Sequence, residues 1–269
     1  MVKYLKLLRI QALAILLTAI LVGFAGKQNI LGISIATLTL FFIALGLWAI
    51  DDYVDKEYDK LAHSKRVIPS GLLDPNVVHK VGILSLATAI CVSSAKIYVE
   101  GDYVLLIMTL IYIALGLVVI NIHKIIRAYS MQTFAKMVIV ATLIGLVFPT
   151  AGGFSAKIIV LGLIVGFFNL GSTIVLDYMD SLTQKSYPNR LMHIGGIIYL
   201  LSSLVIWVPY LSGIFNEICV IPIFGLSLCA LVLSIFCFTW KIDRRVKVIS
   251  ALGSVFVFWI LIIWILYPM

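Results

Sequence analysis

The sequence is divided into apolar runs of about 20 residues, and the few charged residues lie mostly between the runs or close to their ends. A helix needs roughly 20 consecutive apolar residues to cross the hydrocarbon core of a bilayer. Its backbone satisfies its own hydrogen bonds there. Nine runs of this kind occur, at residues 5–26, 30–50, 77–97, 103–121, 133–152, 157–176, 191–213, 217–239 and 246–267. The pattern predicts an all-α, polytopic membrane protein in which nine transmembrane helices form one bundle and one domain, residues 1–269.

The composition excludes a soluble protein. Hydrophobic residues make up 62% of the 269 residues and charged residues 12%, and the mean hydropathy is +1.15. A soluble domain of this length needs about twice as many charged side chains to cover its surface. In a membrane protein the net charge of +8 indicates cytoplasmic loops and contact with membrane lipids, so we do not expect a nucleic-acid partner.

The first apolar run has two interpretations. Lys3, Lys6 and Arg9 precede its apolar core, which ends in small residues near Ala25, and this is also the pattern of a signal peptide. The run is long for a signal-peptide core. We therefore interpret it as an uncleaved first span.

Lysine and arginine are distributed unevenly between the two sets of loops. With nine spans, 17 of the 20 fall at the N-terminus and in the loops after spans two, four, six and eight, and only Lys27, Lys96 and Lys157 fall on the other side. Basic residues accumulate on the cytoplasmic side of membrane proteins. The distribution predicts a multi-pass protein of the cell membrane with a cytoplasmic N-terminus, and the longer cytoplasmic loops place the chemistry on that face.

Four aspartates lie where the second span leaves the bilayer: Asp51, Asp52, Asp55 and Asp59. On a continuing helix Asp52, Asp55 and Asp59 are three and four residues apart, so they share one face. Like charges so placed repel, and carboxylates beside hydrocarbon are costly. A hard divalent cation with oxygen ligands, most simply Mg²⁺, would resolve the repulsion.

A second acidic pair, Asp177 and Asp180, ends the sixth span on the same side of the membrane. Each cluster alone could be an ordinary solvated helix end paired with nearby lysines. Together they hold six of the 12 acidic residues of the chain, which favours a functional site. Two facing acidic helix ends could hold Mg²⁺ ions, and such ions commonly bind a diphosphate.

These motifs resemble those of the UbiA superfamily of intramembrane prenyltransferases. That family has a first motif NDxxDxxxD followed by a segment ending in Pro-Ser-Gly, and a second motif DxxDxxxD. Here residues 51–59 read DDYVDKEYD, residues 61–71 read LAHSKRVIPSG, and residues 177–180 read DYMD. The nine spans, with acids after the second and sixth, also match. The chain departs from the family pattern at Asp51, Val67 and Gln184, which leaves the acceptor open.

The resemblance implies a magnesium-dependent prenyltransferase of isoprenoid and lipid biosynthesis. It would move an isoprenyl chain from a polyprenyl diphosphate to a lipophilic or anionic acceptor, such as a prenylglycerol phosphate or an aromatic quinone precursor. A lid is expected over about 51–76 and a second acidic loop over about 177–190. The residues implied are Asp52, Asp55, Asp177 and Asp180 in catalysis, these four with Asp51 and Asp59 as metal ligands, Lys65, Arg66, Lys124 and Arg127 on the diphosphate, and Arg9 near the acceptor.

Two other functions are compatible with the same residues. A membrane terpene cyclase would ionise the same diphosphate and let the cation attack its own double bonds, giving a product from the donor alone. A cation transporter would use the acids as an ion site, although such acids usually lie near the middle of the membrane. Product mass and ion uptake into vesicles distinguish these functions from prenyl transfer.

Overall fold

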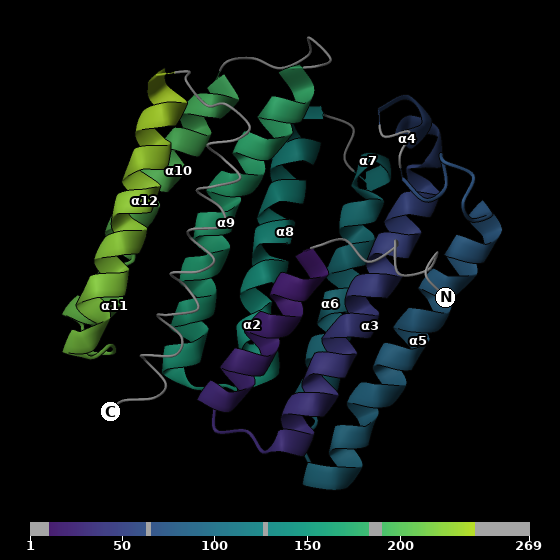
Figure 1. Cartoon of the computed structure of the whole chain (residues 1–269), viewed down its shortest axis with the longest axis horizontal. Helices are drawn as coiled ribbons and strands as arrows, with labels where there is room; N and C mark the ends of the chain where they lie inside the picture. Colours follow the sequence, from purple (N-terminus) through teal and green to yellow (C-terminus); the bar gives the residue numbers. More distant parts are fainter. Residues whose placement is uncertain (1–10, 63–65, 126–128, 183–189, 240–269) are drawn as a thin grey trace.

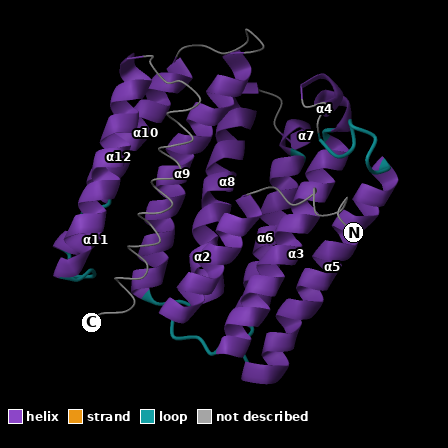
Figure 2. Ribbon diagram, viewed as in Figure 1, coloured by secondary structure: helices purple, strands orange, loops and turns teal. Residues whose placement is uncertain are grey.

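The computed structural model describes residues 11–62, 66–125, 129–182 and 190–239, and every regular element in these ranges is helical (Figures 1 and 2). The helices are α2 (Gln11–Ala25), α3 (Ile30–Val54), α4 (Lys56–Ala62), α5 (Pro75–Glu100), α6 (Val104–Ile120), α7 (Ile122–Ile125), α8 (Tyr129–Gly152), α9 (Ala156–Leu182), α10 (Arg190–Val205), α11 (Val208–Leu211) and α12 (Val220–Thr239), with a 3₁₀ turn over Glu217–Cys219.

The predicted spans can be compared with these helices one by one. Six helical segments are long and apolar enough to cross a membrane, and two more, Leu13–Ala25 and Val104–Ile120, are apolar but shorter. Together they coincide, wholly or in part, with the first eight predicted runs. The ninth predicted run, 246–267, lies outside the described residues. The all-α prediction is therefore confirmed for the part of the chain that the structure describes.

The outer surface of the bundle is apolar. Large hydrophobic side chains that would be buried in a soluble protein are more than half exposed here, as at Leu84, Leu163, Leu204, Leu211 and Ile221. Such a surface suits contact with lipid chains and not with water. The described helices thus have the lengths and the surface of an integral membrane protein.

Helix α8 connects two groups of helices (Figure 1). On one side α3 packs along α5, α6 packs against both, and α2 lies on α3; on the other side α9 packs against α10, and α10 against α12. Helix α8 contacts α2, α3 and α6 of the first group and lies along α9 of the second. The relative position of the two groups therefore depends on how α8 packs.

Glycines allow the closest helix pairs to approach. A Cβ atom built on Gly162 of α9 would lie 2.5 Å from the carbonyl oxygen of Gly145 on α8, and one on Gly145 would lie 2.7 Å from the carbonyl oxygen of Gly162. Small residues at such contacts let helix backbones pack closely where lipid provides no hydrophobic drive for association. The α8–α9 distance is thus set by two glycines.

Hydrogen bonds between helices add to this packing. The hydroxyl of Ser234 on α12 donates to the carbonyl of Gly196 on α10 at 2.8 Å, and Tyr112 on α6 donates to the carbonyl of Leu143 on α8. Polar side chains inside a membrane bundle commonly bond across helices in this way. These bonds fix the register of α10 against α12 and of α6 against α8.

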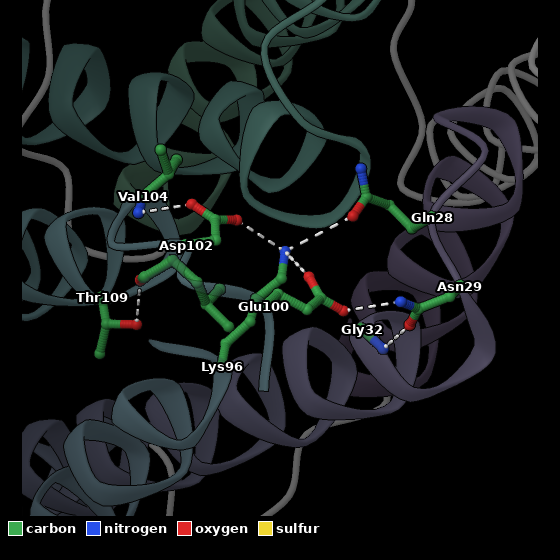
Figure 3. A network of polar contacts seen from close by, with 9 residues as sticks. Gln28, Asn29, Gly32, Lys96, Glu100, Asp102, Val104 and Thr109 are labelled. Carbon is green, nitrogen blue, oxygen red and sulfur yellow. Dashed lines mark hydrogen bonds and ion pairs between the residues drawn. The ribbon is translucent and has the colours of Figure 1, made fainter. Parts of the chain in front are cut away.

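A buried ion-pair network closes one end of the bundle (Figure 3). Lys96, near the end of α5, is 6% exposed, and its Nζ lies 3.0 Å from Asp102 Oδ2 and 3.6 Å from Glu100 Oε2. It also donates to Gln28 Oε1 at 3.5 Å, and Asn29, the N-cap of α3, donates to Glu100 Oε1 at 2.9 Å. The network joins the α2–α3 turn to the end of α5 and the start of α6.

Candidate functional site

The first acidic motif lies at the other end of α3, where this helix meets α4. Asp55 is the C-cap of α3. Its N–H donates to the Asp51 carbonyl at 2.9 Å, and the N–H of Asp59 donates to the Asp55 carbonyl at 2.8 Å. The helical path is therefore interrupted at Asp55 without losing these i→i−4 hydrogen bonds, and it carries the four aspartates on three successive turns, with Asp51 and Asp52 adjacent.

Two of these aspartates are buried against one arginine. Asp52 is 5% and Asp59 1% exposed. Arg66 Nη1 lies 2.7 Å from Asp59 Oδ2 and 3.5 Å from Asp52 Oδ1. Asp52 and Asp59 thus face the same side of the α3–α4 path, and Arg66, from beyond α4 in the chain, supplies their counter-charge.

The second oxygen of Asp59 has an unused bonding capacity. Asp59 Oδ1 is buried and, among the residues that the structure describes, has no hydrogen-bond partner. A buried carboxylate oxygen normally has a partner, so this one is a vacant acceptor. The donor set at this end of α3 consists of carboxylate oxygens, which are the ligands that Mg²⁺ prefers. The chemistry of these residues therefore fits a hard divalent cation.

The described acids do not form a complete metal site by themselves. Within the described ranges, no three His, Cys, Asp or Glu side chains converge closely enough to hold a metal ion. Arg66 lies between Asp52 and Asp59 instead. A metal ion here would need further ligands and a different position of the Arg66 side chain.

The surroundings of Asp55 disfavour the ionised form of its carboxyl group. Burial raises the pKa of the Asp55 carboxyl, and the neighbouring carboxylates of Asp51 and Asp59 raise it further, while Lys136 and Arg66 act in the opposite direction. Both burial and like charges disfavour the ionised carboxylate. An additional cation beside Asp55 would relieve this cost.

Lys136 is a residue of this site that the motif analysis missed. It lies on α8 and is exposed, and its charge acts on Asp55 of the α3–α4 junction. Its place inside a predicted apolar run, at 133–152, was the available signal, since a charge within a membrane span is functional by default. The site is therefore supplied by α8 as well as by α3 and α4.

An aromatic stack borders the acids. The ring of Tyr53 on α3 stacks on the imidazole of His79 on α5, with centroids 4.4 Å apart and planes inclined by 20°. Lys56 Nζ lies 4.6 Å from the centroid of the same tyrosine ring. The stack joins α3 to α5 and directs one ammonium group over an aromatic ring.

The segment that follows Arg66 is anchored. Val67 and Ile68 are buried in one cluster with Ala49 of α3 and Val78 of α5, and the N–H of Ser70 donates to the Arg66 carbonyl at 3.0 Å. Residues 51–76, where a lid is expected, thus comprise the end of α3, the short helix α4 and this packed turn. Its opening as a lid stays a prediction.

The second acidic motif lies at the same end of the bundle. Asp177 and Asp180 belong to the last turns of α9, whose C-terminal end lies near that of α3 along the bundle axis (Figure 1). Their side chains are outside what the structure describes, as is the side chain of Lys124 on α7. Other predicted site residues fall wholly outside the described ranges: Arg9, Lys65 and Arg127.

An apolar groove of about 310 Å³ runs between α8 and α9. Its lining includes Val138, Thr142, Gly145, Gly166 and Leu170 and is almost free of polar atoms. Val138 follows Lys136 by two residues, and Leu170 precedes Asp177 by two helical turns, so the groove extends toward the acidic end of the bundle. Its size is in the range of pockets that hold small ligands.

Comparison with known proteins gives a clear likeness in fold. No family model and no curated protein sequence matches the chain. Among solved structures, it is similar to a digeranylgeranylglyceryl phosphate synthase in membranes, with a TM-score of 0.70 over 97% of this chain and 98% of that one, at 19% sequence identity. At this identity the likeness shows the fold. The chain therefore shares the fold of this synthase, and the fold implied by the resemblance of its motifs is confirmed.

Proposed function

From this fold and from the acids at one end of it, we propose that the protein is an Mg²⁺-dependent intramembrane prenyltransferase. It would transfer an isoprenyl chain from a polyprenyl diphosphate to a lipophilic or anionic acceptor. The observation that carries the proposal is the pairing of buried Asp52 and Asp59 with Arg66, at the end of the bundle where α9 ends in Asp177 and Asp180. A buried acid pair with a vacant oxygen is costly unless it binds something.

Different residues would have different roles in the proposed reaction. Asp51, Asp52, Asp55, Asp59, Asp177 and Asp180 would hold Mg²⁺, which, when bound, neutralises the diphosphate so that it can leave. Arg66 and Lys136 would contact its phosphate oxygens, together with Lys65, Lys124 and Arg127. The allylic C–O bond breaks with its electron pair on the diphosphate. The acceptor then attacks the allylic carbon and loses a proton to solvent or to a nearby base.

Apolar surroundings support both the substrate and the cation. The groove between α8 and α9 suits an isoprenyl chain because its lining is apolar and extends toward the acids. Water must be kept from the allylic cation until the acceptor attacks. The ring of Tyr53, the residue after Asp52, contacts His79 and Lys56 at the edge of this site.

Two lines support an acceptor with a phosphate. The solved structure that shares this fold is a synthase of digeranylgeranylglyceryl phosphate. An anionic acceptor also needs fixed positive charge beside the pocket, which Arg9 and Lys124 would provide. We therefore favour a prenylglycerol phosphate over an aromatic quinone precursor.

The proposal is tested by diphosphate release from prenyl diphosphates in membranes that contain the protein and Mg²⁺. Asp52→Asn and Asp177→Asn should each lower the rate by about a hundredfold or more, as loss of a group that stabilises developing charge does. Glu57→Gln is the matched control, because Glu57 is an exposed acid on α4 that pairs with Lys60 at 2.9 Å. Full activity in both aspartate variants would refute the proposal.

Product mass then identifies the reaction. With a prenylglycerol phosphate present, the product should carry the added isoprenyl group. A hydrocarbon or alcohol formed from the donor alone would instead identify a terpene cyclase. Ion uptake into vesicles without any diphosphate release would identify a transporter.

A further inference from the structure

Arg66 is the described cation that pairs with both buried acids. Its guanidinium contacts Asp59 at 2.7 Å and Asp52 at 3.5 Å. The two carboxylates are 1% and 7% exposed as side chains, whereas Arg66 is 29% exposed. Two buried carboxylates without a counter-ion would be strongly destabilising, so the pairing is needed whenever no metal ion is present.

The same pairing obstructs a metal ion. Asp59 offers a vacant, buried Oδ1, but its Oδ2 accepts a hydrogen bond from Arg66, and Asp52 Oδ1 is ion-paired with the same guanidinium at 3.5 Å. Mg²⁺ requires nearly ideal octahedral geometry with its ligands at about 2.0–2.1 Å. A guanidinium, which stays charged at any accessible pH, repels a divalent ion that approaches the oxygens it holds. Arg66 and the metal ion therefore compete for one set of carboxylates.

The backbone around Arg66 restricts how the competition can be resolved. Val67 and Ile68 are 4% and 7% exposed in the cluster between α3 and α5, and the Arg66 carbonyl accepts the N–H of Ser70 at 3.0 Å. Gly71, with φ +72°, closes the turn in a conformation that favours glycine. The packed turn holds the backbone of Arg66 in place. Because the Arg66 side chain is partly exposed, it can change partners without movement of that backbone.

We propose that Arg66 is an exchangeable counter-cation, which holds Asp52 and Asp59 in the empty site and moves to phosphate oxygens when the metal ion and the diphosphate bind. The proposal rests on the proposed function and assigns Arg66 a second role in it. A metal ion alone must displace Arg66 and leave it without a partner. A metal ion that arrives with a diphosphate gives Arg66 a new bidentate partner. Metal and diphosphate should therefore bind cooperatively.

The first experiment measures metal binding without substrate. Mn²⁺ replaces Mg²⁺ because the signal of free Mn²⁺ can be followed by electron paramagnetic resonance in a solution of the purified protein. Arg66→Gln should bind Mn²⁺ about tenfold more tightly than the wild type, and Arg66→Lys should lie between them. Lys60→Gln removes an equal charge from an exposed position on α4, and its affinity for Mn²⁺ should stay within about twofold of the wild type.

The second experiment measures labelled inorganic pyrophosphate with excess Mn²⁺. The ranking of the variants by affinity should reverse in this experiment, because Arg66 now contacts the phosphate. Arg66→Gln should bind the pyrophosphate about tenfold more weakly than the wild type. Opposite changes in the two experiments are what an exchange requires. Thermal unfolding shows whether Arg66→Gln is folded, and Arg66→Lys, which keeps the charge, provides the same comparison if it is not.

Two results would overturn the proposal, and they are distinguishable. If Arg66→Gln and Arg66→Lys bind Mn²⁺ no more tightly than the wild type, while Asp52→Asn weakens the binding, the exchange is wrong and the metal site stands. If Asp52→Asn leaves Mn²⁺ binding unchanged as well, the metal site itself is wrong, and the proposed function fails with it.

Discussion

The ring of Tyr53 lies nearly parallel to the imidazole of His79, with their centroids 4.4 Å apart. The contact joins α3, one residue after Asp52, to the first turns of α5. It lies beside the packed turn that carries Arg66, since Tyr53 also packs on the cluster of Val67 and Ile68. The acids and the arginine that pairs with them are thus fixed to a common support.

Removing this stack should destabilise the acidic end of the bundle. His79→Ala should cost about 0.5–1.5 kcal/mol beyond the loss of buried area, as aromatic pairs do, and lower the unfolding temperature in detergent. Tyr53→Phe keeps the ring and should unfold close to the wild type. An equal loss in both variants would assign the effect to the tyrosine hydroxyl instead of the stack.

Lys136 should contribute to binding of the donor. Lys136→Gln removes a positive charge that acts on Asp55, and we expect KM for a prenyl diphosphate to rise about five- to tenfold, where tenfold corresponds to about 1.4 kcal/mol. Steady-state kinetics in detergent provide the measurement. Lys157→Gln, an exposed lysine at the start of α9 and so at the other end of the bundle, is the control. A fall in kcat with KM unchanged would contradict a binding role.

The groove between α8 and α9 predicts an effect on chain length. Thr142 is exposed on its wall, and Thr142→Trp would fill part of it. Because the loss of apolar contact grows with each methylene excluded, at about 0.8 kcal/mol each, KM should rise more for long prenyl diphosphates than for short ones. Kinetics with donors of two lengths test this. An equal KM ratio in the wild type and the variant would place the chain elsewhere.

The Lys96 network should be important for stability and not for chemistry. Lys96→Met leaves the carboxylates of Glu100 and Asp102 without the buried ammonium that they contact. Both acids are partly exposed, so we expect a loss of about 1–3 kcal/mol, less than for a fully buried pair. Thermal unfolding measures it, and Lys157→Met is the exposed control. Unfolding of Lys96→Met at the wild-type temperature would show that the network contributes nothing.

The same network predicts a dependence on pH. Partial burial acts to raise the pKa of Asp102, but hydrogen bonds from Lys96 and from the N–H of Val104 outweigh it and hold the pKa below its ordinary value of 3.8. A lowered carboxylate pKa stabilises the fold above the unfolded value, and this contribution is lost as the pH falls through the folded value.

The difference in unfolding temperature between the wild type and Asp102→Asn should therefore stay constant from about pH 7 to about pH 5 and shrink below about pH 4. Unfolding of both proteins across this range is the measurement. A difference that disappears already near neutral pH would mean that Asp102 is not the group responsible.

The sequence was sufficient to predict the long apolar helices that the structure describes, but not how they face one another. Apolar runs of about 20 residues and charges at their ends located the helices because the membrane imposes both. Helices that are apolar on all sides carry little information on which face meets protein and which meets lipid. The closeness of Gly145 to Gly162, and the groove beside them, could therefore not be predicted.

The site was predictable to the extent that it is local. The spacing of Asp52, Asp55 and Asp59 places them on successive helical turns, and the structure has them there, with an interruption at Asp55. The pairing of Arg66 with Asp59 depends on how the turn after α4 packs on α3 and α5. The contribution of Lys136 depends on where α8 lies beside α3. Both are tertiary properties that no spacing within one segment contains.

If the proposed metal site is correct, the contact between Gly145 and Gly162 has a consequence for ion selectivity. The two acidic motifs belong to different groups of helices, and α8 links these groups through its packing on α9. Oxygen ligands lie at about 2.0–2.1 Å from Mg²⁺ and at about 2.3–2.6 Å from Ca²⁺. A change of a few tenths of an ångström in the distance between the two motifs would therefore favour a different ion. In the proposed site, two residues without side chains would thus help to determine which ionic radius is accepted.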